Sequence, residues 1–408
     1  MNNILTEKIS KINFKVFIWH GIFLSLASNF MDVHTIIPSM LINAGGGAIL
    51  LGILTAIMVG GSSLMQIVFA SFLSNKTHKK KPLVTAISLR VITLLLLAFI
   101  LFHSNIISNS LLILFIFILI SIFSFSGSFA NISYVDIMGK SIIDNKRKQF
   151  FSIKQAISSI GILASAIIVR MLLKKFFYPN NYSILLFCAG ILLFIASLGF
   201  WKIKEISVPV KKKRSFLEFF RMIPQEISQN SNLKNYLFII NFLGLGFSLI
   251  PFMILFAKKN FELSATLIGN ILLFKIVGML ITSLILYKRS KQFEYKKLLL
   301  FSLVFGISLP VLSLIFSNNY LMYQLIFVLS GVFITAFRIA KNGILIEISS
   351  NENRAIYTGI SGAGSILPTI FPLIAGILIS VWGYSITFIV VSLIVSFSFV
   401  FIRKLNCR

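Results

Sequence analysis

Long apolar runs alternate with short polar intervals along this chain of 408 residues. Each run is about 20 residues long or longer, the length a helix needs to cross a bilayer. The pattern therefore predicts an all-α integral membrane protein with twelve transmembrane helices. The predicted spans are residues 16–41, 48–73, 82–102, 110–134, 150–173, 183–201, 235–257, 264–286, 298–317, 321–342, 357–381 and 384–402.

The longest polar interval, residues 202–234, separates the first six spans from the last six. We therefore predict an N-terminal six-helix half at 1–201, a cytoplasmic central loop at 202–234 and a C-terminal six-helix half at 235–408. The central loop contains the basic run 211–214, followed by an amphipathic stretch that suits a helix at the membrane surface.

The two halves repeat a pattern at equivalent places. Asn131 precedes Asp136 by five residues near the end of the fourth span, and Asn342 precedes Glu347 by five near the end of the tenth. Internal repeats of this kind are typical of secondary transporters, whose solute site lies between the repeats. The sequence therefore predicts two pseudo-symmetric halves.

Composition and charge agree with a membrane protein. Only 12% of the residues are charged, about half the fraction of a soluble domain. The net charge of +27 would suit nucleic acid only if the cations shared a soluble face. Instead, 28 of the 38 Lys and Arg residues lie in the two terminal segments and in every second interval between spans. Cytoplasmic loops collect such residues, which predicts a multi-pass protein of the cell (inner) membrane with both termini cytoplasmic.

The first span carries Asp32, although a carboxylate inside a bilayer is costly and marks a functional position by default. On one continuous helix, Ser28, Asn29, Asp32 and Thr35 share a face. We expect this face to line a water-filled path for solute or protons. Two residues of the second half join the predicted substrate and proton pathway: Lys275, at mid-bilayer depth, and Asn241, in a span made irregular by Gly and Pro. His20 is expected to be a hydrogen-bonded helix residue.

Residues 71–80 resemble the loop signature of the major facilitator superfamily between its second and third spans. The signature has glycine, three variable residues, aspartate, a basic residue, a variable residue, glycine and two basic residues. Lys76, Lys79 and Lys80 keep the basic positions, whereas the other three positions carry Ser71, Asn75 and His78. Together with twelve spans and two halves, the loop makes the whole chain resemble a bacterial transporter of this superfamily, with the subfamily unassigned.

The resemblance implies a cytoplasmic gate. In the family the loop helps to close the inner side, so a loop cation is expected to pair with Asp136 and Asn75 to meet the start of span eleven. Glu347 with Lys288 or Arg289 is the expected counterpart. The expected gate residues are Asn75, Lys76, Lys79, Lys80, Asp136 and Glu347. Ordinary surface pairs, each contributing less than about 1 kcal/mol, remain an equal alternative. The family places the third span at the periphery, so Arg90 is interpreted as a packing or snorkelling residue.

The expected function is secondary active transport of a small solute by alternating access, with protons as a candidate coupling ion. No enzyme activity, catalytic residue, metal or cofactor is expected, because the few acids at membrane depth are scattered. A pump is not expected, because the chain has no complete Gly-x4-Gly-Lys-Ser/Thr phosphate-binding loop in a soluble domain. Two alternatives stay open: a non-transporting sensor or scaffold of the same fold, and efflux of hydrophobic compounds. The expected partners are a small solute, membrane lipid and protons, with no nucleic acid, and the protein is expected to be a monomer.

Overall fold

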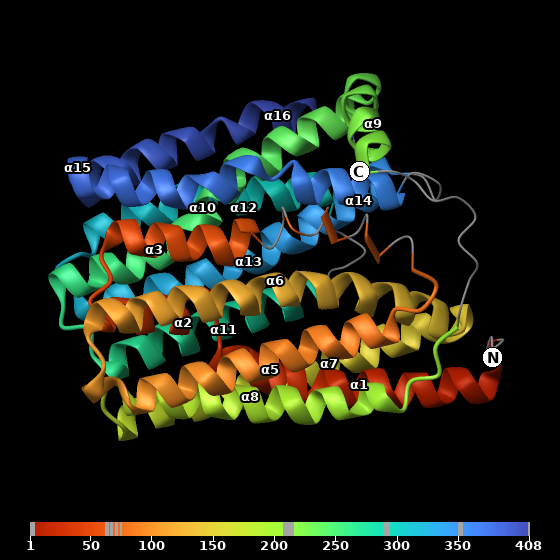
Figure 1. Cartoon of the computed structure of the whole chain (residues 1–408). Helices are drawn as coiled ribbons and strands as arrows, with labels where there is room; N and C mark the ends of the chain where they lie inside the picture. Colours follow the sequence, from red (N-terminus) through yellow and green to blue (C-terminus); the bar gives the residue numbers. More distant parts are fainter. Residues whose placement is uncertain are drawn as a thin grey trace. The chain divides into compact units, whose positions relative to one another are not determined.

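The computed structural model describes residues 5–61, 65, 68–69, 72–73, 76–206, 216–288, 294–349 and 354–406. These residues form helices and no strand (Figure 1). The helices are α1 (Glu7–Phe30), α2 (Ile36–Asn43), α3 (Ala48–Thr55), η1 (Ala56–Gly61), α5 (Lys80–Phe102), η2 (Ser104–Ile106), α6 (Asn109–Ser141), α7 (Asp144–Lys175), α8 (Asn180–Trp201), α9 (Phe216–Gln229), α10 (Ser231–Asn260), α11 (Ala265–Lys288), α12 (Tyr295–Ile315), α13 (Tyr320–Ile348), α14 (Arg354–Ala363), α15 (Ile366–Ser396) and α16 (Ser398–Lys404).

The prediction of an all-helical, multi-pass membrane protein is confirmed. Within the described residues, eight helical segments are long and apolar enough to cross a membrane. One of them, Gly359–Lys404, covers nearly all of the last two predicted spans, and Gly383, with a φ of 80°, marks the boundary between them. The first, second and fifth predicted spans correspond to α1 with α2, α3 with η1, and α7. The helix count is thus consistent with about twelve spans.

Small polar residues determine where several spans begin. Thr6, Ser108, Asn230 and Asn319 each precede a helix and accept a backbone N–H of its first turn through the side-chain oxygen. Such caps satisfy one of the four N–H groups that a helix start leaves unpaired. The starts of α1, α6, α10 and α13 therefore follow from local sequence.

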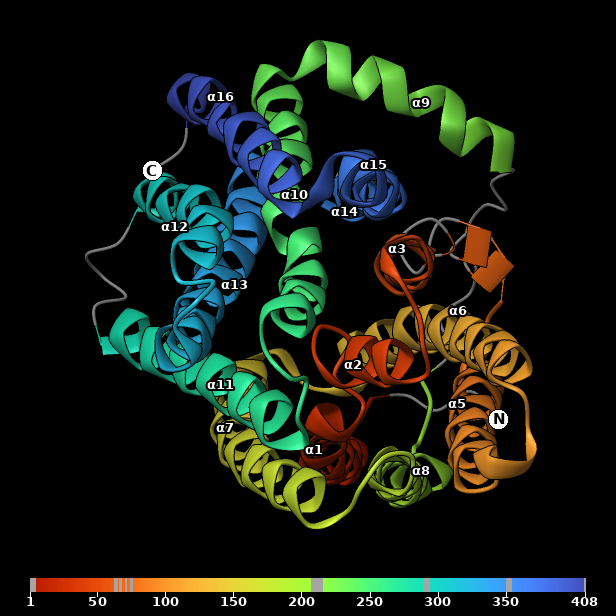
Figure 2. The same cartoon turned by 90° about the vertical axis from the view of Figure 1, so that its left-hand side faces the viewer.

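Contacts group the chain into two compact units, and the first comprises residues 1–32 and 64–218. In this unit α5 packs against α6 and α8, and α1 packs against α7 and α8. Figure 2 shows these helices nearly end-on, with α8 between α1 and α5. Large apolar side chains on the outer face of α5, including Ile92, Phe99 and Phe102, are exposed, as expected for a helix that faces lipid.

The second unit comprises residues 33–63 and 219–408. Helix α10 packs against α12, α13, α15 and α16, and α11 packs against α13. Helix α3 lies along α15 (Figure 2). Residues 33–63 therefore pack with helices of the second half, although they precede them by some 200 positions in the chain. The predicted boundaries at 201 and 235 describe the order of the spans and stay a prediction.

The first predicted span is not one continuous helix. Helix α1 ends at Phe30 and α2 begins at Ile36. Pro38 favours the break, because its ring clashes with the carbonyl four residues earlier and is best accommodated in the first turn of a helix, where Pro38 lies. The expectation of a single polar face from Ser28 to Thr35 is wrong for this reason: Asp32 and Thr35 lie in the break, beyond the end of α1.

Candidate functional site

The predicted pathway residues of the first span have separate environments. Asn29 is buried and donates its amide hydrogens to Ile162 O at 2.6 Å and Ser165 Oγ at 2.9 Å, so it joins α1 to α7. Ser28 donates to Leu24 O of its own helix. Thr35 is fully buried, and Asp32 is partly exposed in the break between α1 and α2. Asn29 and Ser28 are therefore hydrogen-bonded within the first unit, whereas Asp32 and Thr35 lie beyond the end of α1, and their place in a pathway stays a prediction.

In the second unit Asn241 holds an irregular helix in place. Its amide donates to Gly364 O at 2.6 Å, and its Oδ1 accepts the N–H of Leu367 at 2.8 Å. Asn241 thus satisfies backbone groups on both sides of the break between α14 and α15, as a broken helix in a membrane requires. Lys275, on α11, is buried, with 1% of its surface exposed, and its place in a substrate or proton pathway stays a prediction.

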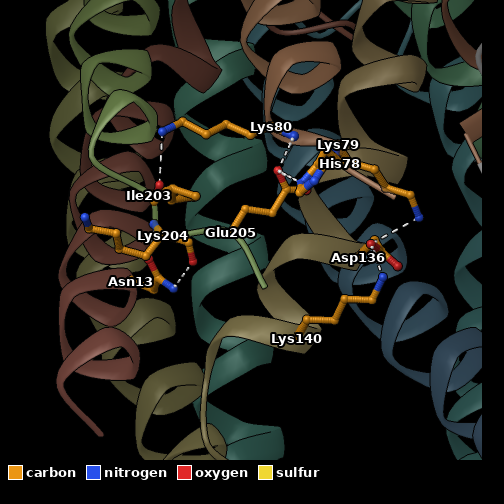
Figure 3. Close-up of polar contacts among 9 residues, drawn as sticks. All are labelled: Asn13, His78, Lys79, Lys80, Asp136, Lys140, Ile203, Lys204 and Glu205. Carbon is orange, nitrogen blue, oxygen red and sulfur yellow. Dashed lines mark hydrogen bonds and ion pairs between the residues drawn. The ribbon is translucent and has the colours of Figure 1, made fainter. Parts of the chain in front are cut away.

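The structure brings two predicted gate residues together (Figure 3). Lys79 Nζ lies 3.1 Å from Asp136 Oδ2, and Lys140 Nζ lies 2.7 Å from the same oxygen. Lys76 instead lies over the ring of Phe72, 4.6 Å from its centroid. The Lys79 side chain is 9% exposed, so this pair is less screened by solvent than an open surface pair.

The remaining gate residues are placed as follows. Lys80 Nζ donates to Trp201 O at 2.8 Å and Ile203 O at 3.0 Å. Glu347 is exposed at the end of α13. Asn75, and Arg289 as a proposed partner of Glu347, lie outside the described residues. The roles of all these residues in a gate stay a prediction.

Glu205, a residue that the sequence analysis did not select, organises the loop before α5 (Figure 3). Its two carboxylate oxygens accept the backbone N–H groups of Lys79 and Lys80, the latter at 3.1 Å. Lys79 is the N-cap residue of α5 and its side chain makes no capping bond. Glu205 therefore supplies the cap from a segment 125 residues away, and its negative charge complements the positive end of the helix. The available signal was an acid that directly follows Lys202 and Lys204 at the start of the basic interval.

We expect Glu205→Ala to destabilise the first unit by about 1–3 kcal/mol, the range for a lost cap and a charged hydrogen bond. Glu205→Gln, which keeps one acceptor oxygen, is expected to lose less. Thermal unfolding of the purified protein measures the difference. The matched control is Glu294→Ala, because Glu294 precedes α12 but makes no capping bond and its ion pair with Lys297 is exposed. Equal melting temperatures for the two alanine variants would contradict the capping role.

The first unit contains a pocket of about 220 Å³ that the sequence analysis missed. Its lining includes one basic or imidazole side chain from each of α1, α5 and α7, together with two polar residues of α6: His20, Arg90, Lys154, Asn131 and Tyr134. Arg90 thus faces this pocket as well as packing on the Phe123 ring, 4.2 Å from its centroid. The prediction that His20 is a hydrogen-bonded residue is wrong for its Nδ1 atom, which is buried and has no hydrogen-bond partner.

The second unit contains a pocket of about 170 Å³ between α10, α13 and α15. Its lining includes Arg338 and Lys341, both of α13, together with Ser365 and Thr369. Each unit therefore has a pocket with two cationic side chains. Among the residues that the structure describes, no group of three His, Cys, Asp or Glu side chains is arranged to hold a metal ion.

Comparison with known proteins agrees with this architecture. Residues 236–406 match the family model described as Major Facilitator Superfamily. No curated protein sequence matches the chain.

Solved structures match over nearly the whole chain. A POT family transporter in complex with a thioalcohol-conjugated peptide has a TM-score of 0.72 at 12% identity, over 97% of this chain and 96% of that one. A D-xylose-proton symporter has a TM-score of 0.71 at 11% identity, over 97% of this chain and 98% of that one. The nucleoside transporter NupG has a TM-score of 0.65 at 13% identity, over 97% of this chain and 100% of that one. The Major Facilitator Superfamily model thus matches residues 236–406, and the whole chain shares the fold of these solved transporters.

Proposed function

We propose that this protein is a secondary active transporter that moves a small solute across a membrane by alternating access. The observation that carries the proposal is the fold, which over 97% of the chain is similar to that of a peptide transporter, a nucleoside transporter and a sugar–proton symporter. The division into two compact helical units, each with its own polar pocket, supports it. The family match and the fold favour a transporter over an enzyme.

Uptake into proteoliposomes tests the proposal. The purified protein is reconstituted, and labelled solutes of neutral, anionic and cationic classes are offered with and without an imposed proton gradient. We expect saturable uptake of at least one class above the level of protein-free vesicles. If no class enters, and cysteines placed in either pocket show fixed accessibility from one side, the non-transporting sensor or scaffold becomes the better account.

We further propose that the protein lies in the cell (inner) membrane with both termini in the cytoplasm. The support is the distribution of Lys and Arg, since the intervals placed inside hold 28 of the 38. A reporter fused at Ser231, the first residue of α10, is expected to report a cytoplasmic location. An external location of that reporter would contradict both the orientation and the number of spans before it.

A further inference from the structure

The predicted spans carry an excess of positive charge. Their only acidic residue is Asp32, whereas they contain six basic residues: Arg90, Lys154, Arg170, Lys275, Arg338 and Lys341. An unpaired charge at membrane depth is costly. A cation in a span that has no acidic partner therefore requires another negatively charged group to neutralise it.

The pocket of the first unit concentrates this charge. Arg90 and Lys154 line it with His20, and within the part of the chain that the structure describes neither cation forms an ion pair with a carboxylate. Lys154 Nζ donates to the Tyr134 hydroxyl at 3.0 Å, which uses one of its three N–H groups. The others are available for a ligand.

The guanidinium of Arg90 is held in position but is not saturated with hydrogen bonds. It stacks on Phe123 from one side, and Gly127 leaves it room, since a Cβ there would lie 3.3 Å from Arg90 Nε. The Nε atom is buried without a hydrogen-bond partner, as is Nδ1 of His20. Buried polar atoms in native proteins are normally paired. Both atoms belong to residues that line this pocket, so the protein itself leaves part of the polar groups of these residues without partners.

We propose that this pocket binds a small oxyanion, a carboxylate or phosphate group, with Arg90 and Lys154 as its counter-charges. A guanidinium presents a planar fork of donors that matches both groups. A volume of about 220 Å³ restricts the ligand to a small one, since pockets for drug-sized ligands begin near about 300 Å³. On the proposed transport function, this oxyanion is the charged group of the solute, so the substrate class is small organic or inorganic anions.

Calorimetric titration of the purified protein with sodium succinate and sodium phosphate tests the inference, with sodium chloride keeping the ionic strength constant. Succinamide, the uncharged analogue of succinate, is the chemical control. We expect binding of at least one anion and none of succinamide. Arg90→Gln and Lys154→Gln are expected to weaken anion binding by about 10- to 100-fold, the loss for a charged hydrogen bond. Arg90→Lys, which keeps the charge, should lose less.

Arg170→Gln is the matched control, because Arg170 lies on α7 with Lys154 but is exposed and outside the pocket. It is expected to bind like the unmodified protein. If Arg90→Gln does not fold, Lys154→Gln and Arg90→Lys still test the pocket. Anion binding that is equal in all variants would overturn the proposal, as would equal binding of succinamide.

Anionic lipid is the other source of an oxyanion. The protein is therefore also reconstituted in nanodiscs of phosphatidylcholine with and without phosphatidylglycerol. Stabilisation by phosphatidylglycerol alone, with no response to either soluble anion, overturns the solute assignment. The uptake assay separates the two proposals: uptake of a neutral solute without anion binding overturns this inference alone, and Arg90-dependent anion binding without any uptake overturns the transporter alone.

Discussion

Replacing Gly331 by valine is expected to prevent most of the protein from folding. Gly331 lies where α13 crosses α11, and a Cβ at this position would overlap the backbone carbonyl of Lys275. Gly278 on α11 meets the backbone of Val328 in the same way. Small residues at such crossings allow close packing, which drives helix association in membranes. A side chain here forces the two helices apart, at a cost of more than about 3 kcal/mol, beyond ordinary overpacking.

Size-exclusion profiles of a fluorescent fusion and the melting temperature of any folded fraction measure the effect. The stability of Gly331→Ala is compared with that of Gly139→Ala. Gly139 is the matched control because it lies within α6 and a Cβ there would meet nothing within 4 Å. Gly139→Ala is expected to leave the stability of the protein unchanged or to raise it slightly, since a glycine inside a helix lowers stability by about 0.5–1 kcal/mol relative to alanine. Equal stability of the two alanine variants would show that the crossing tolerates wider spacing.

Asp32→Asn is expected to abolish proton-driven accumulation of solute while solute exchange at equal concentrations continues. Asp32 is the only acid in the predicted spans, and it lies in the break between α1 and α2, where it is partly exposed. Asparagine keeps the size of the side chain but cannot take up or release a proton. We therefore expect Asp32→Asn to end the coupling of solute transport to proton movement, while binding and movement of the solute continue.

Proteoliposomes with an imposed proton gradient measure accumulation, and counterflow without a gradient measures exchange. Glu262→Gln is the control, because Glu262 is an exposed acid in the segment between α10 and α11 and its neutralisation should leave both activities unchanged. If the Asp32→Asn protein still accumulates solute, Asp32 is ruled out as the coupling acid. Loss of both activities would instead assign Asp32 to solute binding or to the structure of the break.

The local sequence was sufficient to predict the spans, because transfer of a helix into lipid depends on the apolar character of its own run of about 20 residues. Caps such as Asn230 and Asn319 lie next to the helices that they start. Pro38 also acts on its own helix, so the break before α2 was within reach of the sequence. It was missed because the polar spacing around Asp32 was interpreted on an unbroken helix.

Contacts between helices could not be predicted in the same way. A polar residue in a span must face protein or water, and periodicity alone does not say which. Asn29 was predicted to line a pathway, yet its side-chain amide donates hydrogen bonds to two residues of α7. Arg90 was interpreted as peripheral, yet it shares a pocket with Lys154, 64 positions later. Glu205 caps a helix 125 residues away.

The sequence by itself thus determined the helices, their approximate ends and the excess of positive charge at membrane depth. Only the tertiary structure decided which polar side chains are satisfied by a neighbouring helix and which face a pocket. The physical reason is that hydrophobic burial is nearly independent of the partner, since any apolar surface suffices. A hydrogen bond or ion pair, by contrast, requires one particular atom at about 3 Å, and the crossing of helices far apart in the chain determines that atom.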